Sequence, residues 1–364
     1  MFKSLYLWEI KKMISLKGVI ILLVVAILSL LLINAIFNIT IESEFEEVQM
    51  TQTQENTPEE DFNDFNMTQG LKLTKEQAAV ALIFAQSYLD ELEENTKKDR
   101  NFYRSIDQIY QARAYVTVIE YIIDNEKYDT EVMPYMGATS QMMLSLENPS
   151  SQAFIGLYLS FMSIAILIYG IVCGANAYGK EIKTGTLKMV MLRPISRNKL
   201  TLSKLLAALT VSTMFFLGII VFANIFGAIA YESVKGEFLY VFNAQHAFMG
   251  SSNLGMFITI SVLMIQIWCY AAFAMALSTI SKSSVLGITI PSVVAFGITL
   301  LIFTQLGVAR FLFSYNAGSI GEFFGIMPSL YGGSNFWLSL PLLIGYVSLF
   351  IASTFIVFKK RDIA

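Results

Sequence analysis

The chain has 364 residues, of which 55% are hydrophobic and 15% are charged, and its formal net charge is −3 at pH 7. The charged residues fall in a few blocks that are separated by long uncharged runs, which argues against a soluble protein and predicts a membrane protein.

Six uncharged, mainly apolar runs are each longer than the roughly 20 residues that an α-helix needs to cross the bilayer core. They cover residues 18–40, 153–178, 205–230, 254–280, 285–308 and 336–358. The sequence therefore predicts an all-α membrane protein with six transmembrane helices, the first two at 18–40 and 152–178 and the other four within 205–364.

The segment 1–17 precedes the first predicted span. Between Phe2 and Ile14, apolar side chains fall on one arc of a helix, and Lys11 and Lys12 fall opposite. We expect a short helix that lies in the membrane interface.

The segment 41–151 separates the first two predicted spans and carries 22 acidic and 8 basic residues, a formal net charge of −14. Thr74 and Gln77 match a capping box. Two apolar seams with helical spacing follow, at 78–92 and 102–123, with a charged break between them. Two helices with a short connection pack as an antiparallel hairpin, so we expect a helical hairpin domain here.

Basic residues flank the predicted spans on one side. Lys3, Lys11, Lys12 and Lys17 precede the first, Lys359, Lys360 and Arg361 follow the last, and Lys282 lies between the fourth and fifth. Because cytoplasmic loops retain Lys and Arg, we expect a multi-pass plasma-membrane protein with both termini in the cytoplasm. The hairpin domain would then be extracellular.

The basic segment 179–204 would also be cytoplasmic. Residues 180–192 can form a helix of about three turns that ends before Pro194. Leu187 and Met191 fall on its polar side, and exposed apolar residues there suggest a docking surface. An anchor that contacts lipid head groups is the alternative, and the pattern alone does not separate the two.

The six runs contain no Asp, Glu, Lys, Arg or His, which argues against intramembrane proteases and proton-coupled carriers. The strongest polar groups in them are amides that either bond between helices or line a translocation path: Asn34, Asn176, Asn224, Gln266 and Gln305. Both cysteines lie inside predicted spans. The single histidine, His246, has no nearby carboxylate or thiol in the sequence, so we expect no metal site.

Residues 174–180 match the first seven positions of a phosphate-binding loop, from Gly174 to Lys180, but Glu181 replaces the final Ser or Thr. The match also follows an apolar span, whereas a phosphate loop follows a β-strand. We expect no nucleotide site and no enzymatic activity in this chain.

Residues 181–204 read EIKTGTLK, then RPISR, and then Lys204 at the start of a span. This segment resembles the cytoplasmic segment between spans two and three of permeases of the type-2 ABC exporter family, and the chain start with Trp8, Glu9 and Lys11 is similar too. The resemblance implies that the segment is a coupling helix that binds a separate ATPase subunit. Its coupling residues would be Glu181, Lys183, Gly185, Thr186, Leu187, Met191, Arg193 and Arg197.

The resemblance implies two permease copies, identical or homologous, with two ATPases that hold ATP and magnesium, and no cofactor in this chain. The family also dips short helices into the membrane between its last two spans, and the Gly-rich segment 307–335 is the candidate. In having a large outer domain, the chain resembles the branch of this family that is similar to sodium-efflux or bacitracin-resistance permeases. The resemblance does not identify the substrate, and the acidic outer domain makes a cationic peptide, an antibiotic or an ion the first candidates. A membrane-bound sensor or scaffold with a ligand-binding hairpin, and a channel, are the alternatives.

Overall fold

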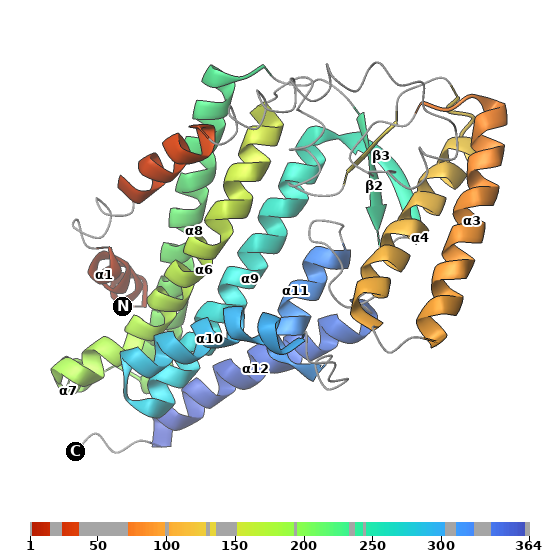
Figure 1. The fold of residues 1–364 in the computed structure, drawn as a ribbon. Helices are drawn as coiled ribbons and strands as arrows, with labels where there is room; N and C mark the ends of the chain where they lie inside the picture. The colour runs from red at the N-terminus through yellow and green to blue at the C-terminus, as the bar shows by residue number, and fades with distance from the viewer. Residues whose placement is uncertain are drawn as a thin grey trace.

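The computed structural model describes residues 2–14, 24–35, 72–98, 102–128, 132–135, 151–192, 195–232, 237–242, 245–302, 311–323 and 336–360. Most of these residues are helical (Figure 1).

Four of the described helices are long and apolar enough to cross a membrane. They are α6 (Ser151–Thr184), α8 (Arg197–Ala230), α9 (Ser252–Ser281) and α12 (Phe336–Lys360). They confirm long apolar helices at the second, third, fourth and sixth predicted spans. The first and fifth predicted spans contain shorter described apolar helices, Val24–Ala35 and the first part of α10 (Ser284–Ile302). The rest of each predicted span includes residues outside the described ranges.

Helix α6 packs against α8, α9 and α10, and two of its glycines lie in close contact with α9. A Cβ atom at Gly174 would lie 2.1 Å from the carbonyl oxygen of Ala271, and one at Gly170 would lie 2.7 Å from the Ile267 side chain. Glycines four residues apart allow two membrane helices to pack backbone against backbone. Gly174 therefore lies inside a continuous helix and allows it to pack closely, although in the sequence this residue is the first position of the partial phosphate-loop pattern.

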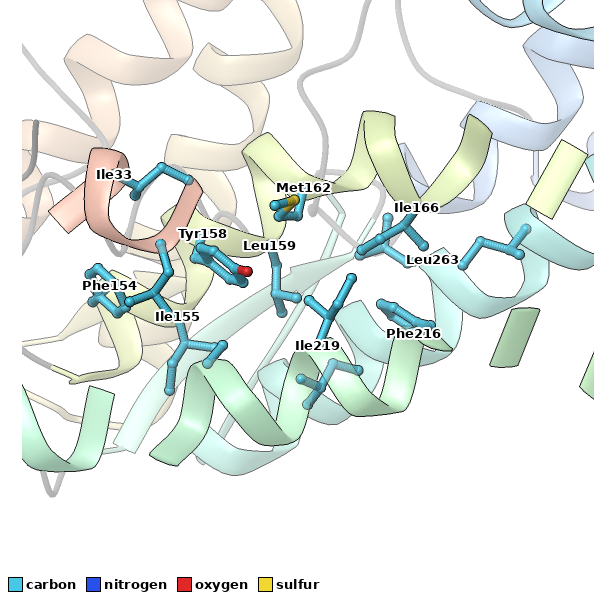
Figure 2. Close-up of a cluster of buried hydrophobic side chains, with 14 residues drawn as sticks. Ile33, Phe154, Ile155, Tyr158, Leu159, Met162, Ile166, Phe216, Ile219 and Leu263 are labelled. Atoms are coloured by element: carbon cyan, nitrogen blue, oxygen red, sulfur yellow. The ribbon is translucent and has the colours of Figure 1, made fainter. Parts of the chain in front are cut away.

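Large apolar side chains fill the space between α6, α8, α9 and the helix Val24–Ala35 (Figure 2). Phe154, Tyr158 and Phe216 are fully buried there. The Tyr158 hydroxyl donates a hydrogen bond to the carbonyl oxygen of Ala26 at 3.1 Å, which satisfies the polar atom of this buried ring.

Many large apolar side chains on the same helices face outward instead. Phe161, Val221, Phe257 and Leu349 are all more than half exposed. Exposing so many large apolar side chains to water is unfavourable, whereas contact with the hydrocarbon of a bilayer suits them. The described helices thus have the surface of a membrane protein.

Two helices, α3 (Lys75–Lys98) and α4 (Phe102–Asp124), lie side by side as the sequence predicts (Figure 1). The capping box is confirmed: the Thr74 amide donates to Gln77 Oε1 at 3.0 Å, and the Gln77 amide donates to Thr74 Oγ1 at 3.3 Å. Ala78 and Ala85 of the predicted seam are buried. Arg113 of α4 pairs with Glu93 of α3 at 2.7 Å.

A small sheet completes this region, so the all-α prediction is wrong in this detail. It contains β1 (Met133–Tyr135), β2 (Glu237–Phe242) and β3 (His246–Ser251) in the order β1-β2-β3. β1 runs parallel to β2, and β2 runs antiparallel to β3 with Leu239 opposite Met249. Leu239 and Val241 share a core with Ile119 and Ile122 of α4. β1 and β2 come from segments about a hundred residues apart, and pairing at that distance leaves no local signal. β2 and β3 are neighbours in the chain, and the sequence analysis did not predict their hairpin.

The elements divide between the two ends of the long helices (Figure 1). Helix α1 (Phe2–Met13), the short helix α7 (Thr186–Met191) and the C-terminal end of α12 lie at one end. The strands β2 and β3 lie at the other, where the Ser151 amide donates to the Glu232 carbonyl oxygen at 2.9 Å. A further helix, α11 (Phe313–Phe323), lies within the Gly-rich segment and packs on α9 and α12.

Candidate functional site

The segment between α6 and α8 forms two helices where the sequence predicts one of three turns. Helix α6 ends at Thr184, and α7 begins at Thr186. Gly185 between them has φ +69°, in the left-handed region that glycine adopts at little cost. The prediction of a continuous helix over 180–192 is therefore wrong, because the chain turns at Gly185.

Helix α7 buries one side and exposes another. Leu187 is only 4% exposed and packs in a cluster with Leu5 of α1 and Leu200 of α8. Met189 is 70% exposed, and Leu192, which follows the helix, is 86% exposed. The expectation that Leu187 is exposed for docking is wrong, since the two-turn geometry directs this side chain into the bundle. Met189 and Leu192 supply the exposed apolar surface instead.

Beside α7, three buried charged side chains from three helices meet. The ammonium nitrogen of Lys204 on α8 lies 2.6 Å from Glu181 Oε1 on α6 and 2.9 Å from Glu9 Oε1 on α1. None of the three side chains is more than 2% exposed. Lys12 of α1, which is partly exposed, also pairs with Glu181. We call Glu9, Lys12, Glu181 and Lys204 the ion network.

The ion network has two carboxylates and two ammonium groups, so its formal charges cancel. The Lys204 nitrogen also lies 5.4 Å from the centre of the Tyr178 ring, within cation–π range. The Tyr178 hydroxyl donates to Thr201 Oγ1 at 2.8 Å. Burial raises the pKa of Glu9 above its ordinary value, and the nearby Lys204 charge opposes this only in part.

Buried ion pairs are costly to break, because removing one partner leaves an uncompensated charge away from water. The ion network therefore holds α1 against α6 and α8 at the end where α7 lies. Arg197 at the start of α8 adds a link to α12, since its guanidinium donates to the carbonyl oxygen of Lys359 at 2.8 Å. A basic group at a helix C-terminus is favourable for the helix dipole.

The predicted coupling residues thus have different surroundings. Glu181 is buried in the ion network, Lys183 and Gly185 are exposed, and Thr186 shares a 2.9 Å hydrogen bond with Thr184 through their hydroxyl groups. Met191 ends α7, but its side chain lies outside the described part of the structure, as does Arg193.

Three described amides of the predicted translocation path have separate hydrogen-bond partners. Asn34 accepts a hydrogen bond from the Tyr231 hydroxyl at 2.6 Å, and Gln266 donates to the Ala317 carbonyl oxygen at 3.0 Å, so both join separate elements. Asn224 donates to the Ile220 carbonyl oxygen of its own helix at 2.8 Å. Asn176 is partly buried on α6, and Gln305 lies outside the described residues. Asn34 and Gln266 thus follow the alternative that such amides bond between helices.

Sequence reasoning missed the ion network, although it singled out Glu181 and Lys204. The available signal was that Glu9 lies among apolar residues on α1, while Glu181 and Lys204 lie at the margins of two apolar runs. Within the described residues, no group of three His, Cys, Asp or Glu side chains could hold a metal ion.

Residues 114–364 match the family described as "Protein of unknown function (DUF2705)". The chain belongs to this family. The match covers α7, Glu181 and Lys204, whereas Glu9, Lys12 and α3 precede it, so the ion network joins the DUF2705 region to the N-terminal helix.

This DUF2705 chain is also similar to the "Uncharacterized membrane protein YdbK" of Bacillus subtilis (strain 168). The two are 26% identical over 229 residues, which cover 59% of this chain and 85% of the relative. The relative and the four long apolar helices agree that the chain is a membrane protein.

Proposed function

We propose that this chain is the permease subunit of a bacterial ABC transporter and acts as an exporter with separate ATPase subunits. The observation that carries the proposal is α7. This six-residue helix departs from α6 at Gly185, is held to the bundle by Leu187, and exposes Met189 and Leu192. A helix that is packed against the bundle on one side and exposes apolar side chains on the other is suited to a groove on another protein.

The proposal places six transmembrane helices in the chain, with both termini and α7 in the cytoplasm and the hairpin of α3 and α4 outside. The distribution of charge supports this orientation. Lys12 lies in the last turn of α1, Lys199 in the first turn of α8, Lys282 directly after α9 and Lys359 in the last turn of α12. In the proposed topology these positions are all on the cytoplasmic side, and cytoplasmic ends of membrane proteins are rich in Lys and Arg. On this model α11 occupies the membrane between the last two spans.

The mechanism follows from the attachments of α7. Leu187 packs against Leu5 and Leu200, and the ion network ties α1 to α6 and α8. Force applied to α7 by a closing pair of ATPases would therefore reach three helices together. Movement requires contacts that differ between two states, and the left-handed turn at Gly185 is the place where the angle between α6 and α7 can change.

Two such permeases, identical or homologous, would enclose a path for a cationic peptide, an antibiotic or an ion. ATP and magnesium would bind to the ATPase partners. The chain contributes the membrane path and the docking helix.

The proposal is tested by purifying the tagged chain from its native membrane in mild detergent and assaying ATP hydrolysis. An ATPase subunit should accompany the chain and hydrolyse ATP. Recovery of the chain without an ATPase, under conditions in which another ABC transporter stays intact, would refute the proposal.

A membrane-bound sensor or scaffold is the second candidate function. The observation that favours it is the core shared by the hairpin and the sheet, which includes Ile119, Ile122 and Leu239 and gives this region a hydrophobic interior of its own. A sensor would purify without an ATPase. A channel, the third candidate, would conduct ions across a planar bilayer without ATP.

A further inference from the structure

Helix α1 packs on the bundle through the apolar arc that the sequence predicts. Leu5 is buried in a cluster with Leu200 of α8, and Ile10 packs against the same cluster. The hydroxyl groups of Tyr6 and of Thr210 on α8 share a 2.7 Å hydrogen bond. The bundle therefore covers this arc, so a bilayer would meet a different side of α1.

That different side alternates basic and apolar residues. Lys3, Leu7 and Lys11 stand at i, i+4 and i+8, and Ile14 follows three residues later, so all four lie along one side of the helix. The Ile14 amide donates to the Ile10 carbonyl oxygen at 3.0 Å, which continues the helical spacing to this residue. All four side chains are exposed, Leu7 at 46% and Ile14 at 38%. We call Lys3, Leu7, Lys11 and Ile14 the outer side of α1.

The outer side carries positive charge alone. Glu9 is the acidic residue of α1, and both it and Lys12 belong to the ion network. The charges on the outer side are therefore those of Lys3 and Lys11, which no carboxylate of α1 offsets. The molecule that covers this side must offer negative charge together with an apolar surface.

The contacts of α1 also fix its level along α8. Glu9 pairs with Lys204, the last charged residue before the uncharged run that begins at Leu205. Tyr6 reaches Thr210, which lies about 9 Å beyond Lys204 along α8. Helix α1 lies across the direction of the long helices at this level (Figure 1). A helix with this orientation, beside the start of an apolar run, lies in the interface between head groups and hydrocarbon.

We propose that the outer side of α1 binds the head groups of anionic phospholipids. Lys3 and Lys11 would lie against the phosphate groups, and Leu7 and Ile14 would contact the upper part of the acyl chains. Lysine side chains at an interface place their charge among the head groups while their stems cover apolar surface. Anionic lipids attract such helices more strongly than zwitterionic lipids do. The inference goes beyond the proposed transport function and rests only on the chain being a membrane protein.

A second copy of the chain is a poor occupant of this side. If two outer sides paired antiparallel about Leu7, Lys3 of each copy would face Lys11 of the other. If they paired parallel, each lysine would face its own equivalent. Like charges placed opposite one another are destabilising, so both arrangements are penalised.

The test reads the lipid next to Trp8, which adjoins Leu7 on α1 and is 41% exposed. Trp268→Phe and Trp337→Phe remove the other tryptophans of the chain. The full chain is placed in nanodiscs that mix phosphatidylcholine and phosphatidylglycerol, and one of the two lipids carries bromine on its acyl chains, which quenches nearby tryptophan. Brominated phosphatidylglycerol should quench Trp8 more than brominated phosphatidylcholine at the same mole fraction. Equal quenching by the two lipids would overturn the proposal.

A pair of lysine variants tests the charges. Each lysine near an anionic surface gives a preference of roughly fivefold, so Lys3→Gln with Lys11→Gln should bring the two lipids to nearly equal quenching. Lys359→Gln with Lys360→Gln removes the same charge from the last turn of α12 and is the matched control, which should keep the preference. A preference that survives the loss of Lys3 and Lys11 would refute the proposal. A preference that is lost equally in the control would show a general effect of charge and would refute it too.

A second pair of variants tests the apolar residues. Leu7→Ser with Ile14→Ser should reduce quenching by both lipids and shift Trp8 emission to longer wavelength, because α1 then lies farther from the acyl chains. Val285→Ser with Val293→Ser, two exposed changes on α10, is the control and should do neither. These variants leave the contacts between α1 and α8 in place, and circular dichroism checks the fold. Unchanged quenching in the folded variant of α1 would contradict the proposal.

The wild-type measurement also separates the other occupants. If neither brominated lipid quenches Trp8, the outer side faces water or another protein, the ATPase of the proposed function included. That result would overturn lipid binding. It would leave the proposed function untouched, because recovery of an ATPase with the chain is a separate measurement.

Discussion

The ammonium nitrogen of Lys204 lies 2.6 Å from a carboxylate oxygen of Glu181, and both side chains are buried. The two residues stand on α8 and α6, on either side of α7 in the sequence. Their ion pair therefore closes the loop that carries α7. Glu9 and Lys12 extend the pair to α1, so the three helices are joined where the proposed ATPase contact begins.

Replacing Lys204 with Met should be strongly destabilising, because it leaves the Glu9 and Glu181 carboxylates buried with only Lys12 nearby. The expected loss in unfolding free energy is about 3–5 kcal/mol. Lys199→Met changes an exposed lysine on the same helix and is the control. Denaturant unfolding in detergent measures both.

A double-mutant cycle separates the ion pair from other effects of the substitution. Adding Glu181→Gln to Lys204→Met should recover part of the lost stability, since it removes one uncompensated charge. Strictly additive losses would show that the two side chains do not interact as the structure places them.

The stability difference between the wild type and Glu9→Gln should depend on pH. Because burial raises the pKa of Glu9 in the folded chain, the folded state retains this proton to higher pH than the unfolded state. As pH rises above the ordinary value of 4.5, the wild type should lose stability relative to the glutamine variant until the folded pKa is passed. Unfolding at several pH values checks this, and the opposite slope would mean that Lys204 dominates the pKa of Glu9.

Gly174→Ala should prevent normal packing of α6 on α9, because the new Cβ atom would lie 2.1 Å from a backbone oxygen that cannot move away cheaply. Gly218→Ala on α8 is the matched control, since nothing lies within 4 Å of its Cβ position. The control should be neutral or more stable by about 0.5–1 kcal/mol. Thermal unfolding in detergent compares the two, and equal midpoints would contradict the close contact.

Gly185→Ala should strain the turn between α6 and α7. No atom lies within 4 Å of a Cβ at this position, so the cost comes from the left-handed backbone alone, about 1–2 kcal/mol. Gly185→Asn should cost less, because asparagine tolerates this conformation better. Thermal unfolding that ranks Gly, Asn and Ala in this order would support the turn, and equal stability of all three would contradict it.

The features that the sequence predicted correctly are those that depend on residues close together in the chain. The capping box at Thr74 and Gln77 and the runs of α6, α8, α9 and α12 each depend on residues close together in the chain, and the structure confirms them. The left-handed turn at Gly185 has only a single glycine as its signal, and this is why a continuous helix was expected there.

The ion network and the pairing of β1 with β2 depend on residues far apart in the chain. Glu9 and Lys204 are separated by nearly two hundred positions, and the burial of Lys204 follows from the packing of α1 on α8. The sequence analysis placed Leu187 on one continuous helix and therefore predicted that its side chain is exposed. The bend at Gly185 turns that side chain inward and leaves Met189 and Leu192 outside.

The central claim is that α7 docks a separate ATPase, and the most direct test is to place charges on its exposed surface. Met189→Asp with Leu192→Asp is compared with Ile229→Asp, an equally exposed change at the opposite end of α8. The account predicts that the α7 variant remains folded but loses the accompanying ATPase and its ATP hydrolysis, while the Ile229 variant keeps both. Normal recovery of the ATPase with the α7 variant would contradict the account.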